Sequence, residues 1–385
     1  MYDIILQVLI ILAAAVIAGE IFEQFKLPSV AGQLLSGLIL GPSLLGVLSY
    51  NSMLNGISSI AIFFIVFLIG IEMDTGMLKK LKKALPLSVT SFIIPFLFEF
   101  LIMAYVAKLD VTTMFVVALA TAIPSISIIS VLVSKYSLLE KESGKVILSS
   151  VIISDIIAFV LLSAISGGAN HVSYVVTSLL VFLILYFSVD YLINKNRKAI
   201  RSRLEVVWRK FKSGHFAYGA LMILGFLVST LFNLIGLSYL IGAFFAGLII
   251  NRGLIGGTAF GRVKRTLGRI NDGFFIPIFF GTAGLEAGLS SGTFNFTLGI
   301  LMIALAAFLA SYALSYNLAG RFIAKKEANS KRKIAGITSG RGAVGIAIAV
   351  IALNSGLLGS DAYTAIIVAT VIISVIVGIV LYGVA

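Results

Sequence analysis

Two charged residues stand out in this chain because they lie deep inside apolar segments. Asp155 lies near the centre of the apolar stretch 144–166, and Arg341 lies within 334–354. A charge at the centre of a bilayer costs at least about 2.5–3.5 kcal/mol, so such residues usually have a function. A desolvated carboxylate can hold either a proton or a small cation. Asp155 is therefore predicted to be a site where a proton and a cation compete, and a structural pairing with Arg341 is the alternative.

The helices that would carry these residues contain two interruptions. Pro124 lies in the middle of the apolar stretch 112–134, and Gly340 and Gly342 flank Arg341. A proline inside a membrane helix removes a backbone hydrogen bond and exposes carbonyl groups. Two interrupted helices at matching positions indicate an ion site at the middle of the membrane, whereas a simple proline kink with glycine packing is the alternative. Arg341 could neutralise the negative ends of the half-helices or take part in ion handling.

Other chemistry-bearing residues carry less weight. Glu99 also lies inside an apolar stretch and is a second proton-site candidate, or a carboxylate that faces an aqueous funnel. Glu72 is a secondary acidic candidate at the end of a stretch, where interfacial solvation is the simpler interpretation. The chain has no cysteine and only two histidines, and it lacks a phosphate-binding loop, so an enzyme with a thiolate, histidine or nucleotide site is not expected.

The composition indicates the kind of fold that must position these residues. Of 385 residues, 59% are hydrophobic and 12% are charged, and the mean hydropathy is +1.11. These values predict an all-α polytopic membrane protein, which we divide into thirteen apolar spans. With that division, 27 of the 29 basic residues fall in loops on one side. The net charge of +13 is then a signal for orientation in the membrane and does not indicate nucleic-acid binding. It predicts a plasma-membrane protein with its N-terminus outside and its C-terminus cytoplasmic.

The chain also repeats itself. Three stretches match in the same order, namely 30–39 with 240–249, 70–72 with 284–286, and 151–154 with 371–374. Spans 1–6 therefore resemble spans 8–13, with span 7 as a linker helix. Because a single linker span separates the two six-helix repeats, the second repeat enters the membrane from the opposite side. Such inverted repeats are typical of secondary transporters.

Four motifs together resemble the monovalent cation:proton antiporter superfamily, in its Kef-type and NapA-type branch. They are the segment from Leu27-Pro28 to Gly41-Pro42, residues 67–74, residues 277–280, and the helix with Ser154-Asp155. The resemblance implies the NhaA/NapA-like fold with two broken, crossing helices, and a homodimer with a scaffold and a moving core. The expected parts are scaffold 1–75, core 85–166, linker helix 172–193, scaffold 215–290 and core 293–385.

The resemblance also implies the function. Asp155 would be the shared proton and cation site of an antiporter that works by alternating access, with Thr121, Ser125 and Ser154 as further oxygen donors. Electrogenic members commonly have a second acid where this chain has Ser154, and a lysine in the eleventh span, which is absent here. The Gly340-Arg341-Gly342 segment resembles the electroneutral branch. We therefore expect electroneutral exchange of Na⁺, or alternatively K⁺, for H⁺, without a cofactor.

Two other functions stay open at this stage. One is a sodium-coupled symporter of an organic anion, and the other is a gated cation channel or sensor on the same scaffold. The expected partners are the cation, the proton, the lipid bilayer and a second copy of the chain. Kef-type relatives often carry a cytoplasmic nucleotide-binding domain. Because this sequence stops at Ala385, directly after its last span, such regulation is expected to come either from a separate cytoplasmic subunit or from a domain that has been trimmed away.

Overall fold

The computed structural model describes residues 3–72, 81–106, 109–124, 142–166, 177, 214–234, 239–250, 257–288, 294–322 and 328–382. These residues form helices joined by loops and turns, and an isolated bridge between Pro124 and Arg341 is the one β-type pairing among them. Six of the described helices are long and apolar enough to cross a membrane. The predicted all-helical membrane architecture is confirmed, whereas the predicted linker helix 172–193 lies outside the described residues apart from residue 177.

The chain divides into two compact units. Unit 1 comprises Met1–Ser59, Met77–Ala158 and Ile276–Ala385, and unit 2 comprises Ile60–Gly76 and Phe159–Phe275. Unit 1 contains α1 (Ile4–Gln24), α2 (Ser29–Leu40), α5 (Leu81–Ser88), the π-helix η1 (Val89–Ile93), α6 (Ile94–Val106), α7 (Val111–Ala122), α16 (Ile276–Glu286), α17 (Phe294–Phe322), α18 (Ala328–Thr338), α19 (Ala343–Asn354) and α20 (Ser360–Tyr382). Unit 2 contains α12 (Gly214–Leu234), α13 (Tyr239–Ile249), α15 (Gly257–Ile270) and the π-helix η2 (Asn271–Phe275), and α3 (Ser52–Glu72) and α9 (Glu142–Ser166) contribute to both units. The division into scaffold and core stays a prediction.

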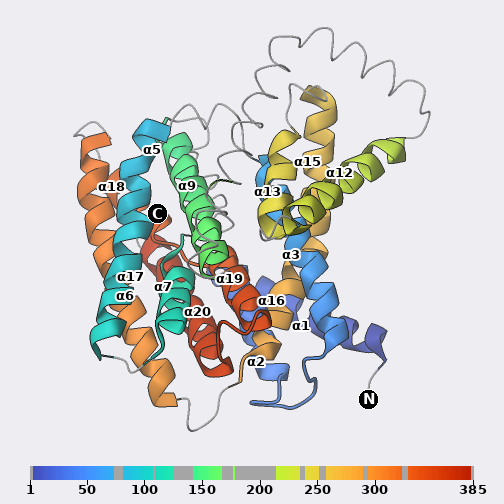
Figure 1. The fold of residues 1–385 in the computed structure, drawn as a ribbon, viewed down its shortest axis with the longest axis horizontal. Helices are drawn as coiled ribbons and strands as arrows, with labels where there is room; N and C mark the ends of the chain where they lie inside the picture. The colour runs from blue at the N-terminus through green and yellow to red at the C-terminus, as the bar shows by residue number, and fades with distance from the viewer. Residues whose placement is uncertain are drawn as a thin grey trace. The chain divides into compact units, whose positions relative to one another are not determined.

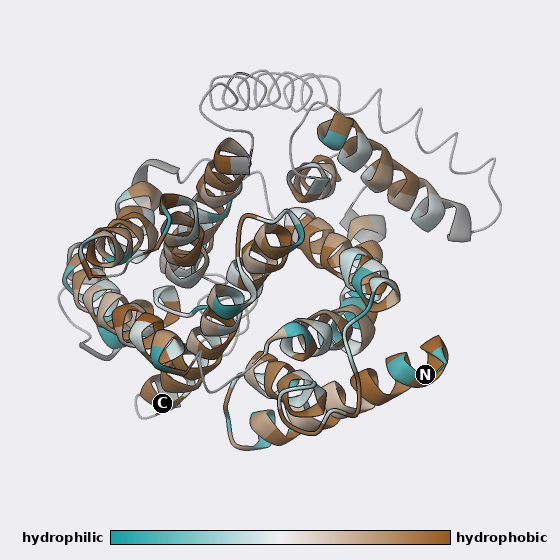
Figure 2. Ribbon diagram, turned by 60° about the horizontal axis from the view of Figure 1, so that its bottom comes forward, coloured by the Kyte–Doolittle hydropathy of each residue, from teal (hydrophilic) through white to brown (hydrophobic). Residues whose placement is uncertain are grey.

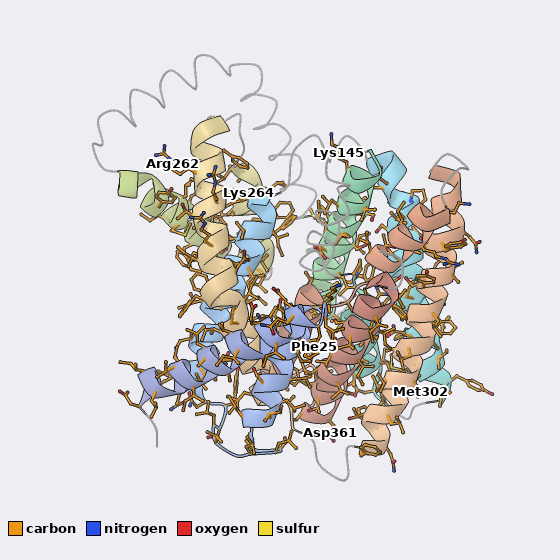
Figure 3. All side chains as sticks on the ribbon, turned by 180° about the vertical axis from the view of Figure 1, so that it is seen from behind. Phe25, Lys145, Arg262, Lys264, Met302 and Asp361 are labelled. Atoms are coloured by element: carbon orange, nitrogen blue, oxygen red, sulfur yellow. The ribbon has the colours of Figure 1, made fainter. Side chains whose placement is uncertain are left out.

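Several helices of unit 1 are arranged as expected for a membrane protein. In α1, the inward positions carry Gln7, Ile11, Ala15 and Gly19, while large apolar side chains such as Ile5 and Leu9 are exposed. Small residues on the packed face and apolar residues on the outer face are typical of helices that pack within lipid. Figure 2 shows that hydrophobic residues predominate along the other helices as well. Lys145 on α9 and Asp361 on α20 lie at opposite ends of this unit (Figure 3).

Two helix ends differ from the apolar pattern for local reasons. The stretch 29–50 reads as one span, but α2 ends at Leu40 because Gly41 and Pro42 follow. The next helix, α3, begins at Ser52, where Asn51 Oδ1 accepts the backbone N–H groups of Met53 and Leu54 at 3.1 and 3.0 Å.

Glycines bring α2 and α16 into backbone contact in unit 1. A Cβ atom added to Gly37 would collide with the carbonyl oxygen of Gly281 and would lie 2.8 Å from the nitrogen of Leu285. A Cβ atom on Gly284 would likewise collide with the carbonyl oxygen of Leu34. Only glycine permits so close an approach of the two helices.

The same contact recurs within unit 2, between α13 and α3. A Cβ atom on Gly247 would collide with the carbonyl oxygen of Phe67, and one on Gly70 would collide with that of Phe244. The sequence repeat pairs Gly37 with Gly247 and Gly284 with Gly70. The two contacts are therefore equivalent in the register of the repeat, which supports the repeat, although its inverted topology stays a prediction.

A capping contact at the start of α7 leads to a pH-dependent prediction. Asp110 accepts the N–H of Thr113 at 2.8 Å, and this hydrogen bond lowers the pKa of Asp110 from its ordinary value. Because the pKa is lower in the folded state, the contribution to stability is present above the unfolded pKa and is lost as the pH falls through the folded pKa. We expect Asp110→Ala to lower stability by about 0.5–1 kcal/mol at neutral pH. Thermal unfolding in detergent would show this difference at pH 7 and a smaller one in acid; an equal loss at both pH values would contradict it.

Candidate functional site

In unit 1, the end of α7 meets the interruption between α18 and α19. Helix α7 ends at Ala122, and α18 ends at Thr338 with α19 beginning at Ala343. Between these ends, Pro124 and Arg341 pair through their backbones in an antiparallel bridge. The predicted interruption around Gly340, Arg341 and Gly342 is therefore present, Pro124 and Arg341 both lie outside the helices, and α7 and α19 lie side by side (Figure 1). We call this place the crossing.

Close packing at the crossing again depends on a glycine. A Cβ atom on Gly345 in α19 would collide with the carbonyl oxygen of Ala120 in α7. The half-helix that follows Arg341 is thus held directly against the half-helix that precedes Pro124.

Arg341 is buried at the crossing, where its side chain binds a backbone carbonyl of η1 and its own carbonyl accepts a hydroxyl of α20. Its side chain is 1% exposed, and Nη1 donates a hydrogen bond to the carbonyl oxygen of Ser91 at 3.3 Å. Pro95, four residues after Ser91, has no N–H, so this carbonyl lacks its usual α-helical donor. The Ser374 hydroxyl of α20 donates to the carbonyl oxygen of Arg341 at 2.8 Å. Arg341 thereby ties the crossing to η1 and α20.

The charge of Arg341 interacts with Glu99 on α6. Glu99 is 1% exposed, and its Oε2 contacts the hydroxyl of Thr121 on α7. The same hydroxyl lies 2.7 Å from the carbonyl oxygen of Val117. Since a hydroxyl has one proton to donate, Thr121 can serve only one of these two acceptors at a time. Glu99 therefore faces Thr121 rather than solvent.

Asp155 lies on α9 in a different setting. Its side chain is 2% exposed, and neither carboxylate oxygen has a hydrogen-bond partner among the described residues. A buried carboxylate without a partner is strongly unfavourable unless it binds a proton or a cation. Among the described residues no group of three or more acidic, histidine or cysteine side chains could hold a metal ion together, so Asp155 would need other oxygen donors.

The hydroxyl of Ser154 is next to Asp155 in the chain and is engaged by two neighbours. It donates to the carbonyl oxygen of Ser150 at 3.0 Å and lies 2.8 Å from the hydroxyl of Ser88 on α5. Because the single proton of Ser154 points to Ser150, Ser88 is the donor in the second contact. One lone pair of Ser154 remains free to accept a cation.

Some sequence-predicted residues cannot be placed. Ser125 and the side chain of Glu72 lie outside the described residues, so both stay predictions. In return, the structure adds Ser88, Ser91 and Ser374, which sequence reasoning missed. A proline four residues after Ser91 was the available signal, because it frees the carbonyl group that Arg341 binds.

A multi-helix membrane protein in which the interrupted helix α18–α19 meets the end of α7 beside buried charges has the features of a secondary ion transporter. The chain matches the family model "Sodium/hydrogen exchanger, transmembrane" over residues 9–384. It therefore belongs to the sodium/hydrogen exchanger family, whose members are transporters rather than enzymes, and the expected membership in the cation:proton antiporter superfamily is confirmed.

Individual relatives agree with the family. The chain is 27% identical over 282 residues to the probable Na⁺/H⁺ antiporter 3 of Methanocaldococcus jannaschii, which covers 72% of this chain and 70% of that protein. It is 24% identical over 378 residues to the Na⁺/H⁺-K⁺ antiporter GerN of Bacillus cereus, covering 97% and 94% of the two chains. Its fold is similar to that of the sodium proton antiporter MjNhaP1 from Methanocaldococcus jannaschii, with a TM-score of 0.65, 18% identity, and coverage of 98% of this chain and 95% of the other.

Proposed function

We propose that this chain exchanges a monovalent cation for a proton by alternating access, with Asp155 as the binding site that the two ions share. The observation that carries the proposal is the buried Asp155 carboxylate, whose two oxygens have no partner among the described residues. Such a carboxylate can be neutral with a proton or neutral with a cation, but it is costly when empty. Exchange at one site follows, because each ion must displace the other.

The charges near the crossing support this assignment. The charges of Arg341 and Glu99 attract one another, whereas neither carboxylate oxygen of Asp155 has a hydrogen-bond partner among the described residues. Arg341 is therefore attracted to an acid other than Asp155, and the Asp155 carboxylate is left for a transported ion. Arg341 would act structurally, by holding the crossing to η1.

The cation is Na⁺ in our proposal, with K⁺ as the alternative. Relatives are named as Na⁺/H⁺ antiporters, as a K⁺/H⁺ antiporter of Saccharomyces cerevisiae, and as an antiporter of both cations. We further propose that the protein is a homodimer with its N-terminus outside. The orientation rests on the 27 basic residues that the predicted topology places on the cytoplasmic side.

Electroneutral exchange is the expected result of a flux measurement. Ser154 is neutral where electrogenic relatives carry an acid, so a single carboxylate would exchange one proton for one cation. In proteoliposomes with an internal pH dye, an inward Na⁺ gradient is expected to raise the internal pH, whereas choline does not. In symmetrical K⁺, the initial rate with valinomycin should equal the rate without it.

Two outcomes would contradict this proposal. A rate that rises when valinomycin clamps the voltage would show that transport moves net charge. An internal pH that stays constant under Na⁺, K⁺ and Li⁺ gradients, in vesicles shown to contain folded protein, would refute cation/proton exchange itself.

A further inference from the structure

The segment before Pro95 has an unusual backbone. Residues Val89–Ile93 form the π-helix η1, in which the N–H of Ile94 binds the carbonyl oxygen of Val89, five residues back. A π-helical turn within an α-helix is rare and occurs frequently at functional sites. Its wider turn leaves backbone and side-chain groups with partners other than those of a regular helix.

The hydroxyl of Ser91 in this turn departs from the usual bonding of hydroxyls in a helix, as do those of Thr297, Ser311 and Thr370 in the same unit. In apolar helices a hydroxyl normally donates to a carbonyl three or four residues back, as do Thr90, Ser150, Ser154, Thr338 and Ser339. Ser91 is 1% exposed, yet its Oγ has no hydrogen-bond partner among the described residues. A buried hydroxyl that forgoes this bond costs free energy and calls for a ligand, a water molecule or an ion.

Two contacts place Ser91 near the Asp155 region. Ser88, one turn earlier on the same continuous helix, contacts Ser154, the residue adjacent to Asp155, at 2.8 Å. The carbonyl oxygen of Ser91 itself accepts from Arg341 at the crossing, at 3.3 Å. Ser91 therefore lies between the turn of α9 that carries Asp155 and the crossing, and all these residues belong to unit 1.

We propose that the Ser91 hydroxyl is a further ligand of the transported cation, together with the Asp155 carboxylate and the remaining lone pair of Ser154. The inference rests on the proposed function, because it adds a donor to the same site. Alkali cations prefer oxygen ligands, and one carboxylate alone supplies too few of them. The Arg341 bond to the Ser91 carbonyl holds this turn in place, while the interaction with Glu99 offsets the positive charge of Arg341 that would otherwise repel a cation.

The test is the cation dependence of exchange in proteoliposomes. Ser91→Ala is expected to raise the apparent KM for Na⁺ by about tenfold, the effect of losing one neutral oxygen ligand, with a much smaller change in the maximal rate. Ser91→Thr keeps the hydroxyl and should restore most of the affinity. The matched control is Ser229→Ala on α12, which also removes a buried, unpartnered hydroxyl but should leave the KM unchanged.

A second variant keeps the inference testable if Ser91→Ala does not fold. The chain contains no cysteine, so Ser91→Cys introduces a single thiol of nearly the same size. Its reaction with a small thiol reagent should be slowed by Na⁺ and not by choline, whereas the thiol of Ser229→Cys should react equally in both. If wild type exchanges cations but Ser91→Ala keeps the wild-type KM, or Na⁺ gives Ser91→Cys no protection, the ligand assignment is wrong and the proposed function stands. If wild type itself does not exchange cations, the proposed function fails first.

Discussion

Asp155→Asn is expected to reduce cation-driven proton movement to the rate of protein-free vesicles, a loss of at least about a hundredfold. The amide is close in size to the carboxylic acid but neither releases a proton nor carries the negative charge that a cation needs. The measurement is the Na⁺-driven change of internal pH in proteoliposomes that contain equal amounts of folded protein.

This substitution should separate function from folding. Asp155 is buried without a hydrogen-bond partner among the described residues, so its charge stabilises nothing that the amide would remove. Thermal stability is therefore expected to stay the same or to increase, because a neutral side chain costs less to bury. An inactive variant with a lowered melting temperature would instead indicate a structural role.

The matched control is Asp361→Asn, at the exposed start of α20. This carboxylate lies in the first helical turn, where its charge contributes only about 0.3–1 kcal/mol to the stability of the helix. Exchange should continue at nearly the wild-type rate. Wild-type exchange by Asp155→Asn would overturn the assignment of the shared site.

The second large effect is expected at the paired glycines. Gly37→Ala and Gly247→Ala each place a methyl group onto a carbonyl oxygen of the partner helix, that of Gly281 or that of Phe67. Neither obstacle is a flexible side chain, so the helices must separate. Overpacking of this kind typically costs about 1–3 kcal/mol, and alanine gains roughly 1 kcal/mol over glycine in a helix, so we expect a net loss of up to about 2 kcal/mol.

Gly299→Ala on α17 is the control, because a Cβ atom added there meets nothing within 4 Å. It should leave the melting temperature unchanged or raise it. Gly37→Ala and Gly247→Ala should lower the melting temperature in detergent by similar amounts, since their contacts are equivalent in the repeat. If either variant were as stable as Gly299→Ala, the close approach of the backbones would be refuted.

The sequence alone was sufficient for the class of the protein because hydropathy and charge depend on composition along the chain. The all-helical membrane architecture followed from the apolar stretches, and the interruption at Gly340 and Gly342 followed from local backbone chemistry. Helix ends set by side-chain caps, such as the start of α3 at Ser52, were not visible in hydropathy.

Asp155 and Arg341 could be selected from the sequence, since a charge in an apolar segment is conspicuous at any position. Their partners could not be selected, because they lie far away in the chain. Arg341 binds the carbonyl of Ser91, 250 residues earlier, and its charge interacts with Glu99. Only the tertiary structure decided that Glu99 is the acid that interacts with Arg341, and that Asp155 has no hydrogen-bond partner among the described residues. The physical reason is that charges interact according to their distance in space and not according to their order in the chain.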